Sequence, residues 1–366
     1  MRGIMTKGFV TGAVQPMVWA GDCLRLLDQR VLPHEERWLE CRGAGDVARA
    51  IHDMAVRGAP AIGIAAGYGM ALALRGDPGS YDAAEAVLAK SRPTAVNLRW
   101  VLERLRRLKD RSAAAVLAEA RRIHEEDLAQ NRRMAQFGAA LLPRGARVLT
   151  HCNTGALATG GHGTALGVIR TAHAQGRIAQ VFATETRPWL QGARLTAWEL
   201  QKENIPARLI ADGAAAWLMA RHDIDWVIVG ADRIAANGDT ANKIGTYALA
   251  VAAARHGVKF MVVAPTSSFD PRCARGADIH IEERAALELT EFRGTLVAPA
   301  NVDAFNPVFD VTPAGLITAL VCEEGVIRKP SVAAIRGVLG RPTKKAKKGS
   351  DPFFTPAWKR VRKARK

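Results

Sequence analysis

The segment WVIVGADR, residues 226–233, places four apolar residues directly before a glycine, an alanine and two charged residues. An apolar run of this length that is rich in β-branched residues is typical of a strand buried on both faces. Similar short runs recur between helix-like stretches, at residues 147–150, 178–182, 207–210 and 259–263. Strands that alternate with helices predict a parallel sheet covered on both faces. We therefore expect an α/β domain over residues 143–340.

The first part of the chain follows another pattern. Short extended apolar pieces occupy residues 15–40, and from residue 46 to about 137 the apolar residues recur at helical spacing. This pattern predicts a small antiparallel sheet followed by a helical bundle, which together form a domain over residues 1–142. The chain has 366 residues, more than one hydrophobic core usually fills, so two domains are expected.

The net charge of +17 is concentrated at the C-terminus. From Arg341 to Lys366 the chain has eleven basic residues and one acid, Asp351, so this segment supplies +10 of the total. Its apolar content is too low for a core, which predicts a basic disordered tail over residues 341–366. Such a tail could contact nucleic acid, but lysine runs are usually passive, and we expect no specific contact.

Several protein classes are disfavoured by the sequence. No apolar run approaches the roughly 18 residues of a membrane-spanning helix, and the N-terminus makes a poor signal peptide. The five cysteines are odd in number and include no C-x-x-C pair. A disulfide framework or a zinc site is therefore not expected, and a cytoplasmic protein fits best.

The residues that follow the predicted strands are the candidates for chemistry, because ligands of parallel sheets bind beyond the carboxyl ends of the strands. A thiol and three carboxylates occupy these positions: Cys152, Glu185, Asp212 and Asp232. Neighbouring residues on a strand point to opposite faces, so His151 is not expected to be the base for Cys152.

Cys152 precedes a glycine-rich loop, residues 154–164, and a predicted helix. Free amides of the loop and the start of the helix could hold a phosphate or favour a thiolate. A buried structural cysteine is the alternative interpretation. The loop has neither the G-x-G-x-x-G nor the G-K-[ST] pattern, so dinucleotide and Walker-type nucleotide binding are disfavoured.

Asp232 is placed at the edge of a core of low dielectric constant, where its pKa should rise toward a value that is useful for acid–base chemistry. The alternative is a helix cap or an ion pair with the neighbouring Arg233.

Four further polar side chains could bind an anion. Asn242 and Lys243 are predicted to open a helix, where they either cap it or hold the anion. Arg57 and Arg92 each precede a predicted helix start and are either exposed charges or parts of a phosphate clamp. The sequence does not choose between these interpretations, and the same holds for Gln191.

Eight segments, taken together, resemble the methylthioribose-1-phosphate isomerase family, aldose-phosphate isomerases related to the regulatory subunits of the translation-initiation guanine-nucleotide exchange factor. The segments are DMAVRGAPAIG (53–63), RPTAVNL (92–98), HCNTG (151–155), ETRP (185–188), QGARLT (191–196), GADRI (230–234), NKIGT (242–246) and NPVFDVTP (306–313). They occur in order, and the resemblance extends from about residue 18 to about residue 327.

The resemblance implies a fold and a function. An N-terminal sheet and helical bundle would pack on a Rossmann-like C-terminal domain, and two chains would form a homodimer. Cys152 and Asp232 would be the catalytic pair that converts 5-methylthioribose 1-phosphate to 5-methylthioribulose 1-phosphate in methionine salvage, without metal or other cofactor. The substrate site would be formed by Arg57, Gly58, Ala59, Arg92, Gln191, Asn242 and Lys243.

Two other functions are compatible with the same segments. The enzyme could act on 5-deoxyribose 1-phosphate or ribose 1,5-bisphosphate; the tract of Met54, Val56, Ile62 and Trp100 favours an apolar pocket over a second phosphate site. The chain could also be a non-catalytic regulatory subunit of the exchange factor. A thiol and a carboxylate at two strand ends favour catalysis over this alternative.

Overall fold

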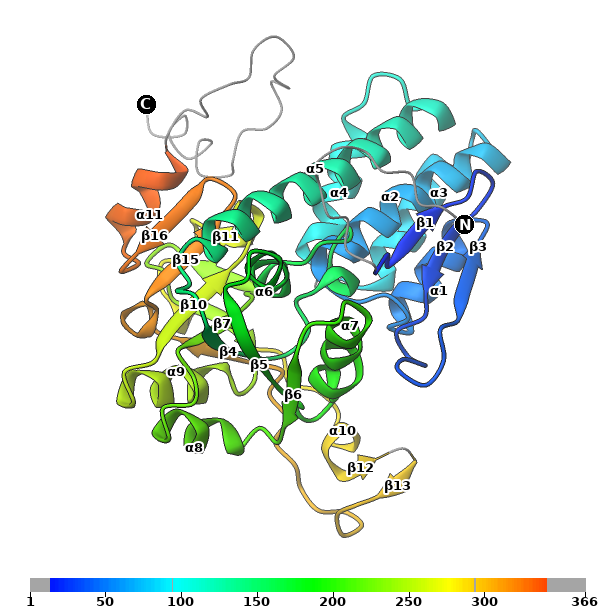
Figure 1. Ribbon diagram of the computed structural model, residues 1–366. Coiled ribbons are helices and arrows are strands. Elements are labelled where there is room, and N and C mark those ends of the chain that lie inside the picture. The colour runs from blue at the N-terminus through cyan, green and yellow to red at the C-terminus, as the bar shows by residue number, and fades with distance from the viewer. Residues whose placement is uncertain (1–13, 94, 293, 341–366) are drawn as a thin grey trace.

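The structure, a computed structural model, describes residues 14–93, 95–292 and 294–340. The predicted basic tail, residues 341–366, lies outside the described residues. The chain forms a mixed α/β fold with a small antiparallel sheet, a larger and mostly parallel sheet, and helices (Figure 1), as predicted from the sequence.

The N-terminal part combines a three-stranded antiparallel sheet with a helical bundle (Figure 1). Its elements are β1 (Met17–Trp19), β2 (Leu24–Leu27), β3 (Trp38–Cys41), α1 (Ala44–His52), α2 (Ala59–Gly76), α3 (Tyr81–Ser91), α4 (Val96–Arg106) and α5 (Ala113–Ala139). Small and apolar residues line nearly every side of α2, so this helix lies in the middle of the bundle. A Cβ atom at its Gly63 would lie 2.9 Å from the backbone oxygen of Asn97, which shows how closely α4 approaches.

The larger sheet has the strand order β16-β15-β10-β7-β4-β5-β6, and only β16 runs antiparallel to its neighbour. The strands are β4 (Ala146–Thr150), β5 (Ile178–Thr184), β6 (Ala207–Ile210), β7 (Trp226–Val229), β10 (Lys259–Val263), β15 (Ala319–Cys322) and β16 (Gly325–Arg328). The five strands expected from apolar runs are all present. From β4 the chain winds outward through β5 and β6, and then returns to the other side of β4 through β7 and β10.

Helices cover both faces of this sheet (Figure 1). Residues of α5, α6 (Ala165–Ala174) and α7 (Ala197–Lys202) fill the core on one face. Residues of α8 (Ala214–Ala220), α9 (Thr246–Arg255) and α11 (Val332–Leu339) fill the core on the other. Helix α5 connects the two parts of the molecule, because its first half packs in the N-terminal core and its second half packs on the sheet.

A second sheet has four strands, and its strand β8 (Arg233–Ala235) follows strand β7 of the large sheet directly in the chain. This sheet has the order β11-β8-β9-β14, with β9 (Thr240–Lys243), β11 (Phe269–Asp270) and β14 (Phe309–Thr312). Sequence periodicity did not predict this sheet, because its strands are only two to four residues long.

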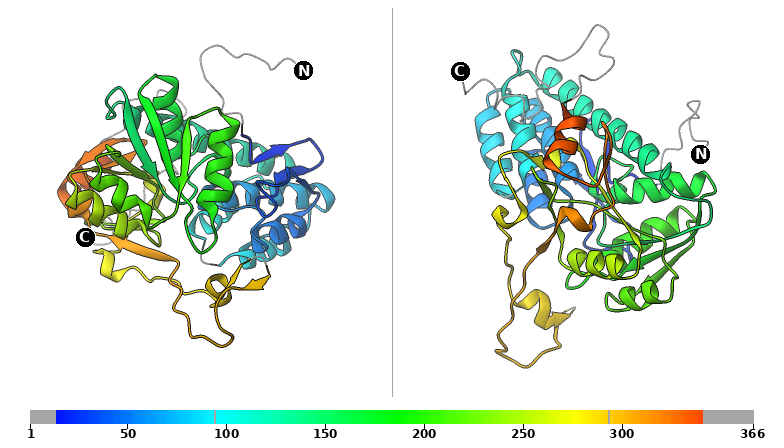
Figure 2. Two further views of the ribbon diagram at one scale, coloured as in Figure 1. Left: turned by 60° about the horizontal axis from the view of Figure 1, so that its bottom comes forward. Right: turned by 90° about the vertical axis from the view of Figure 1, so that its left-hand side faces the viewer.

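Residues 285–292 and 294–305, which we call the arm, project from the body (Figures 1 and 2). The arm carries α10 (Leu287–Thr290) and the two-stranded hairpin of β12 (Glu291–Phe292) and β13 (Thr295–Leu296). Its base is closed by antiparallel pairing of residues 282–284 with residues 306–308: Arg284 N donates to Asn306 O (3.0 Å) and Val308 N donates to Glu282 O (2.9 Å).

None of the described helices is both long and apolar enough to cross a membrane.

Candidate active site

The topology of the large sheet brings Cys152 and Asp232 to the same edge. Strands β4 and β7 are parallel neighbours, with Thr150 aligned to Ile228. Cys152 follows β4 and Asp232 follows β7, so both leave the sheet at adjacent carboxyl ends, where strands lie about 4.8 Å apart. Because the strand order reverses between β4 and β7, the helices on either side diverge here and leave room for a ligand.

The backbone of Cys152 is held in an uncommon conformation. Its φ is +66°, in the left-handed region, and the neighbouring Thr186 has φ +62°. Cys152 N donates to Thr186 Oγ1 (2.9 Å), and Cys152 O accepts from Thr196 Oγ1 (2.6 Å). Gln191 Nε2 donates to the thiol sulfur at 3.3 Å. Strained residues of this kind cluster at functional sites, and here the strain fixes the position of a partly exposed thiol.

In the glycine-rich loop after Cys152, several of the amides that the sequence suggested as free are paired within the protein. Its amides at residues 156 and 157 donate to Glu199, that of Gly160 donates to Asp127, and those of Gly161 and Gly163 donate to Thr159 Oγ1. The Glu199 carboxylate is fully buried and is also paired with Arg170 (3.2 Å). These amides are therefore occupied by the protein and cannot hold a phosphate.

The same loop joins the two parts of the molecule. A Cβ at Gly58 would lie 2.2 Å from Ala158 O, and the φ of Gly58 is +89°, so only glycine fits between α2 and the loop. On α5, Asp127 accepts from Gly160 N (2.7 Å), while His124 Nε2 bonds to Gly160 O (2.6 Å). Burial raises the pKa of Asp127 to about 6. These contacts with the helical bundle therefore hold in place the loop that follows Cys152.

His151 is a structural residue. Its Nδ1 bonds to Thr184 Oγ1 (2.7 Å) and its Nε2 to Ile244 O (2.9 Å), so both ring nitrogens have partners in the protein. Burial lowers the pKa of this imidazole. These contacts agree with the expectation from strand alternation that His151 is not the base for Cys152.

Asp232 is in contact with solvent, but much of its surroundings is protein. This loss of bulk water is the largest influence on its pKa and raises it, while nearby cations, Lys243 first among them, lower it. Arg233 does not neutralise this carboxylate, since it lies near Asp270 instead (3.8 Å). Asp232 is therefore a carboxyl group whose protonated form is favoured by its setting, as expected from the sequence.

Asn242 and Lys243 do not open a helix, as the sequence suggested; they end strand β9, and α9 begins at Thr246. Pairing with β14, in which Phe309 lies opposite Lys243, overrides the helical pattern. The buried Lys243 ammonium donates to Val308 O (3.0 Å) and lies 4.7 Å from the Phe309 ring centroid. Burial lowers its pKa, while the nearby Cys152 and Asp232 side chains raise it.

Arg57 and Arg92 lie at the same site. The Arg57 guanidinium stacks 4.3 Å from the centroid of the Trp189 ring, and burial lowers its pKa to about 10. Arg92 follows directly on the end of α3, and α4 begins only at Val96, so Arg92 is not at a helix start as predicted. Burial also lowers the pKa of Arg92. In the described part of the chain, the Nη1 atoms of both arginines are buried without a hydrogen-bond partner.

Sequence reasoning missed three residues around this site. Arg284, at the base of the arm, influences the pKa values of Asp232, Lys243 and both site arginines. Trp189 supports Arg57, and Thr186 holds the backbone of Cys152. None of the three belongs to a pattern of periodicity or spacing, although Thr186 lies in one of the segments that carry the family resemblance.

Asp212, a further candidate from the sequence, has a structural role. The Asp212 carboxylate accepts from the backbone amides of Thr186 and Arg187 (both 2.8 Å), and so fixes the loop beside Cys152.

The apolar tract expected to form a pocket does not exist as one surface. Val56 and Ile62 are buried in the N-terminal core, whereas Trp100 is exposed beside Arg104.

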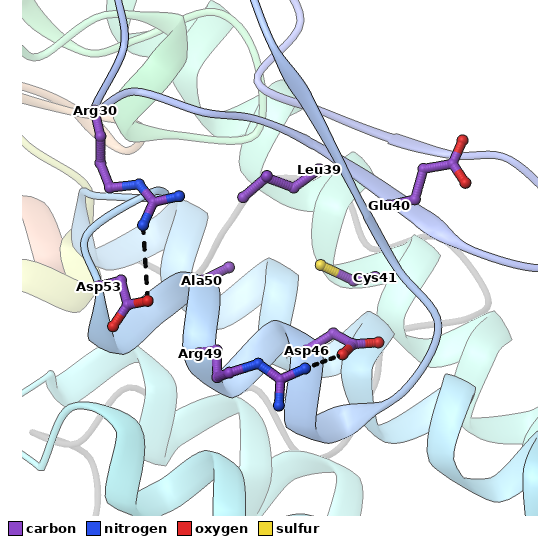
Figure 3. A pocket seen from close by; sticks show the side chains of 8 residues that line it. All are labelled: Arg30, Leu39, Glu40, Cys41, Asp46, Arg49, Ala50 and Asp53. Carbon is purple, nitrogen blue, oxygen red and sulfur yellow. Dashed lines mark hydrogen bonds and ion pairs between the residues drawn. The ribbon is translucent and has the colours of Figure 1, made fainter.

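Figure 3 shows a different depression, between β3 and α1. Its lining residues are Arg30, Leu39, Glu40, Cys41, Asp46, Arg49, Ala50 and Asp53, none of which belongs to the candidate site. Burial raises the pKa of its Cys41 thiol to about 12, so this cysteine is not a nucleophile at neutral pH. We therefore assign no chemistry to this depression.

Among residues 14–93, 95–292 and 294–340, no group of three or more His, Cys, Asp or Glu side chains is arranged to hold a metal ion.

Comparisons with known proteins place this geometry in a family. The model of the Initiation factor 2 subunit family matches residues 55–329. The chain belongs to this family. A methylthioribose-1-phosphate isomerase of Alkalilimnicola ehrlichii is 57% identical over 338 residues, which cover 89% of this chain and 98% of the relative. The family resemblance expected from the sequence is thus confirmed.

Solved structures of the family have the same fold. A 5-methylthioribose 1-phosphate isomerase from Pyrococcus horikoshii OT3 superposes with a TM-score of 0.86 at 41% identity, over 90% of this chain and 97% of the other. A structure described as translation initiation factor eIF-2B, subunit delta, from A. fulgidus gives 0.82 at 43% identity, over 90% and 100%. The chain is therefore similar both to a protein named as an enzyme and to one named as a factor subunit. The chemistry of the site has to distinguish these two functions.

Asp310 links the site to helix α9. Its carboxylate accepts from the amides of Gly245 (2.7 Å) and Tyr247 (3.0 Å), and it lies on β14 opposite Asn242. Burial raises the pKa of Asp310 from 3.8 to about 6. A raised carboxyl pKa means that the folded state favours the proton; the resulting stability is fully present below about pH 4 and is lost as pH rises through about 6.

We predict that Asp310→Asn removes this pH dependence. The asparagine oxygen keeps one acceptor for α9 but does not titrate, so the wild type should lose at most ~3 kcal/mol relative to the variant between pH 4 and 6.5. Urea unfolding of both proteins at a series of pH values measures the difference. A difference that stays constant, or that changes in favour of the wild type as pH rises, would contradict the assignment.

Proposed function

We propose that this chain is a methylthioribose-1-phosphate isomerase, with Cys152 and Asp232 as its catalytic pair. The observation that carries the proposal is a group of buried or half-buried cations around a carboxyl group and a thiol. Arg57, Arg92 and Lys243 influence the pKa of Asp232 directly, and two of these cations have buried N–H groups without a partner among the described residues. Buried charges are normally paired, so this site is built for an anion.

A sugar phosphate suits such a site. A phosphate monoester carries a charge of about −1.5 to −2 at neutral pH and offers three strong acceptor oxygens. Arginine side chains bind these oxygens through paired N–H donors, and Lys243 adds a point charge. We propose that Gly58 and Ala59 contribute at the start of α2, where the helix leaves its first amides unpaired. Gln191 and Asn242, both almost fully buried, would orient the sugar.

The first step follows from the substrate. An aldose that is phosphorylated on its anomeric hydroxyl cannot open to a free aldehyde, so the ring oxygen must leave carbon 1 while the phosphate stays. That oxygen needs a proton as the bond breaks. Asp232, whose protonated form is favoured by its surroundings, is the proton donor in this proposal.

The hydrogen on carbon 2 then moves to carbon 1 by one of two routes. In the first, the Cys152 thiolate removes it as a proton, an enol phosphate forms, and the thiol returns the proton to carbon 1. In the second, it moves as a hydride to the cationic carbon 1. In both routes the Asp232 carboxylate takes the proton of the carbon 2 hydroxyl, which leaves the ketose and restores the acid. The hydrogen bond that Gln191 donates to the sulfur of Cys152 would stabilise the thiolate that the first route uses.

The finer description of the fold is also a proposal. We propose a Rossmann-like domain over residues 143–340, because strands β6-β5-β4-β7-β10-β15 follow the order 3-2-1-4-5-6 of doubly wound sheets. We propose an N-terminal domain over residues 1–142. All five cysteines are free thiols, which supports a reducing, cytoplasmic location.

The function is tested by incubating the protein with 5-methylthioribose 1-phosphate and observing the ketose by NMR. Parallel reactions use 5-deoxyribose 1-phosphate and ribose 1,5-bisphosphate. We expect the highest kcat/KM for the methylthio substrate. Turnover of none of the three would favour the second candidate, a factor subunit, which rests on the similarity to the A. fulgidus protein. A preference for the bisphosphate would redirect the proposal to that substrate.

We predict that Cys152→Ser and Asp232→Asn each lower kcat by about a hundredfold or more, since each removes a proton-transfer group. Both changes are nearly isosteric, so the melting temperature should be unchanged. The Cys41→Ser variant is the matched control, because that buried thiol lies outside the site. Normal turnover in a folded Cys152 or Asp232 variant would remove that residue from the mechanism.

We propose further that the protein is a homodimer formed through the arm. Six apolar side chains of the arm are exposed, with Phe305 the most exposed at 74%: Leu287, Phe292, Leu296, Val297, Val302 and Phe305. A cluster of this size is unusual on a monomer and is typical of an interface.

We predict that light scattering gives twice the mass of one chain, and that the double variant Val297→Ser, Phe305→Ser gives the mass of a single chain. The exposed Trp217 on α8 provides the control, because Trp217→Ser should leave the mass at two chains. A monomeric wild type would exclude the dimer, and loss of the dimer in the Trp217 variant would move the interface to α8.

A further inference from the structure

Arg284 is fixed at the base of the arm by the backbone and by its own ion pairs. Its amide donates to Asn306 O (3.0 Å), so it belongs to the antiparallel pairing that closes the arm. Its Nε donates to Glu282 (3.1 Å), and its Nη1 lies 3.7 Å from Glu288. Only 16% of the side chain is exposed. This arginine is therefore held in one place, and is not a mobile surface charge.

The base of the arm also holds the side chain of Lys243. Val308, which pairs with Glu282 in the base, accepts the Lys243 ammonium on its carbonyl oxygen (3.0 Å). The next residue, Phe309, lies opposite Lys243 in the β9–β14 pair and beneath its ammonium. The strand that pairs with Arg284 in the base therefore continues into the strand that pairs with Lys243. The side chains of Arg284 and Glu282, two residues apart on an extended segment, point to the same face.

The charge of Arg284 acts at the centre of the site. It lowers the pKa of the Asp232 carboxyl and of three cations there, so all four groups lie within its electrostatic reach. Its two carboxylate partners use Nε and Nη1, and no hydrogen bond to another residue in the described part of the chain uses Nη2. The Nη2 group of a fixed guanidinium therefore remains available as a donor to a ligand.

We propose that Arg284 is a further substrate-binding residue, which adds a fourth cationic group to a site for a phosphate monoester dianion. The inference rests on the proposed function, because it assumes that the anion is the phosphate of the sugar. Glu282 orients the guanidinium through its hydrogen bond with Nε, and the phosphate binds the Nη2 group. Four cations around one dianion exceed what charge neutrality requires, and the surplus also stabilises the Asp232 carboxylate that forms when the acid has donated its proton.

A purely structural role for Arg284 makes a different prediction. If its ion pairs serve only to close the arm, removal of either partner should have the same effect on the site through Lys243. Glu288→Gln is therefore the matched control, since it removes an ion-pair partner and leaves the arginine charge in place.

The experiment measures the binding of inorganic phosphate by calorimetry, at constant ionic strength so that screening is equal in all samples. The proteins are the wild type, Arg284→Gln, Arg284→Lys and Glu288→Gln. We expect Arg284→Gln to weaken phosphate binding roughly tenfold to a hundredfold, as for the loss of a charge-assisted hydrogen bond. Arg284→Lys should recover part of this loss, and Glu288→Gln should bind like the wild type. With 5-methylthioribose 1-phosphate, Arg284→Gln should raise KM more than it lowers kcat.

Equal phosphate affinity in the wild type and Arg284→Gln would overturn the proposal, as would an equal loss in Arg284→Gln and Glu288→Gln. If the glutamine variant does not fold, the lysine variant decides: it keeps the charge but not the planar fork, so wild-type affinity in that variant counts against a guanidinium–phosphate contact. Phosphate binding does not depend on turnover. A wild type that binds phosphate through Arg284 but converts no sugar phosphate would therefore refute the proposed function and leave the binding residue in place.

Discussion

The parallel pairing of β4 with β7 determines where the chemistry of this molecule is located. Two strands from distant parts of the sequence run side by side in the same direction, and each is followed at once by a reactive side chain. Because both strands end at one edge of the sheet, Cys152 and Asp232 lie at the same edge although they are far apart in the sequence. The reversal of strand order at the same point separates the flanking helices and leaves the edge open to a ligand.

The electrostatics of the site follow from what surrounds this edge. The helical bundle supplies Arg57 and Arg92, the small sheet supplies Lys243, and the base of the arm supplies Arg284. Burial lowers the pKa of each of the first three, which means that burial destabilises their charged forms. A bound dianion would reverse this effect. The same cations keep the Asp232 pKa from rising further, so that the acid can also release its proton.

Much of the fold and part of the site could be predicted from the sequence, because they depend on local patterns. Apolar runs identified the buried strands, and helical spacing identified the bundle; strand ends then pointed to Cys152 and Asp232. Local patterns failed where pairing decided the outcome. Asn242 and Lys243 have a sequence compatible with a helix start, yet β14 pairs with them and makes them a strand end. The glycine loop suggested free amides, but Glu199 and Asp127, on distant helices, accept hydrogen bonds from three of them.

The sequence by itself determined the strands of the large sheet that follow apolar runs, the helical bundle, the two reactive residues and the membership of a family, since these depend on residue types at short spacing. Only the tertiary structure decided which cations surround the reactive pair, because Arg57, Arg92, Lys243 and Arg284 come from four separate segments of the chain. Their charges act through space over distances that the packing of those segments sets. Desolvation by the surrounding protein likewise exists only after folding, and it is desolvation that raises the pKa of Asp232 and lowers that of the cations around it.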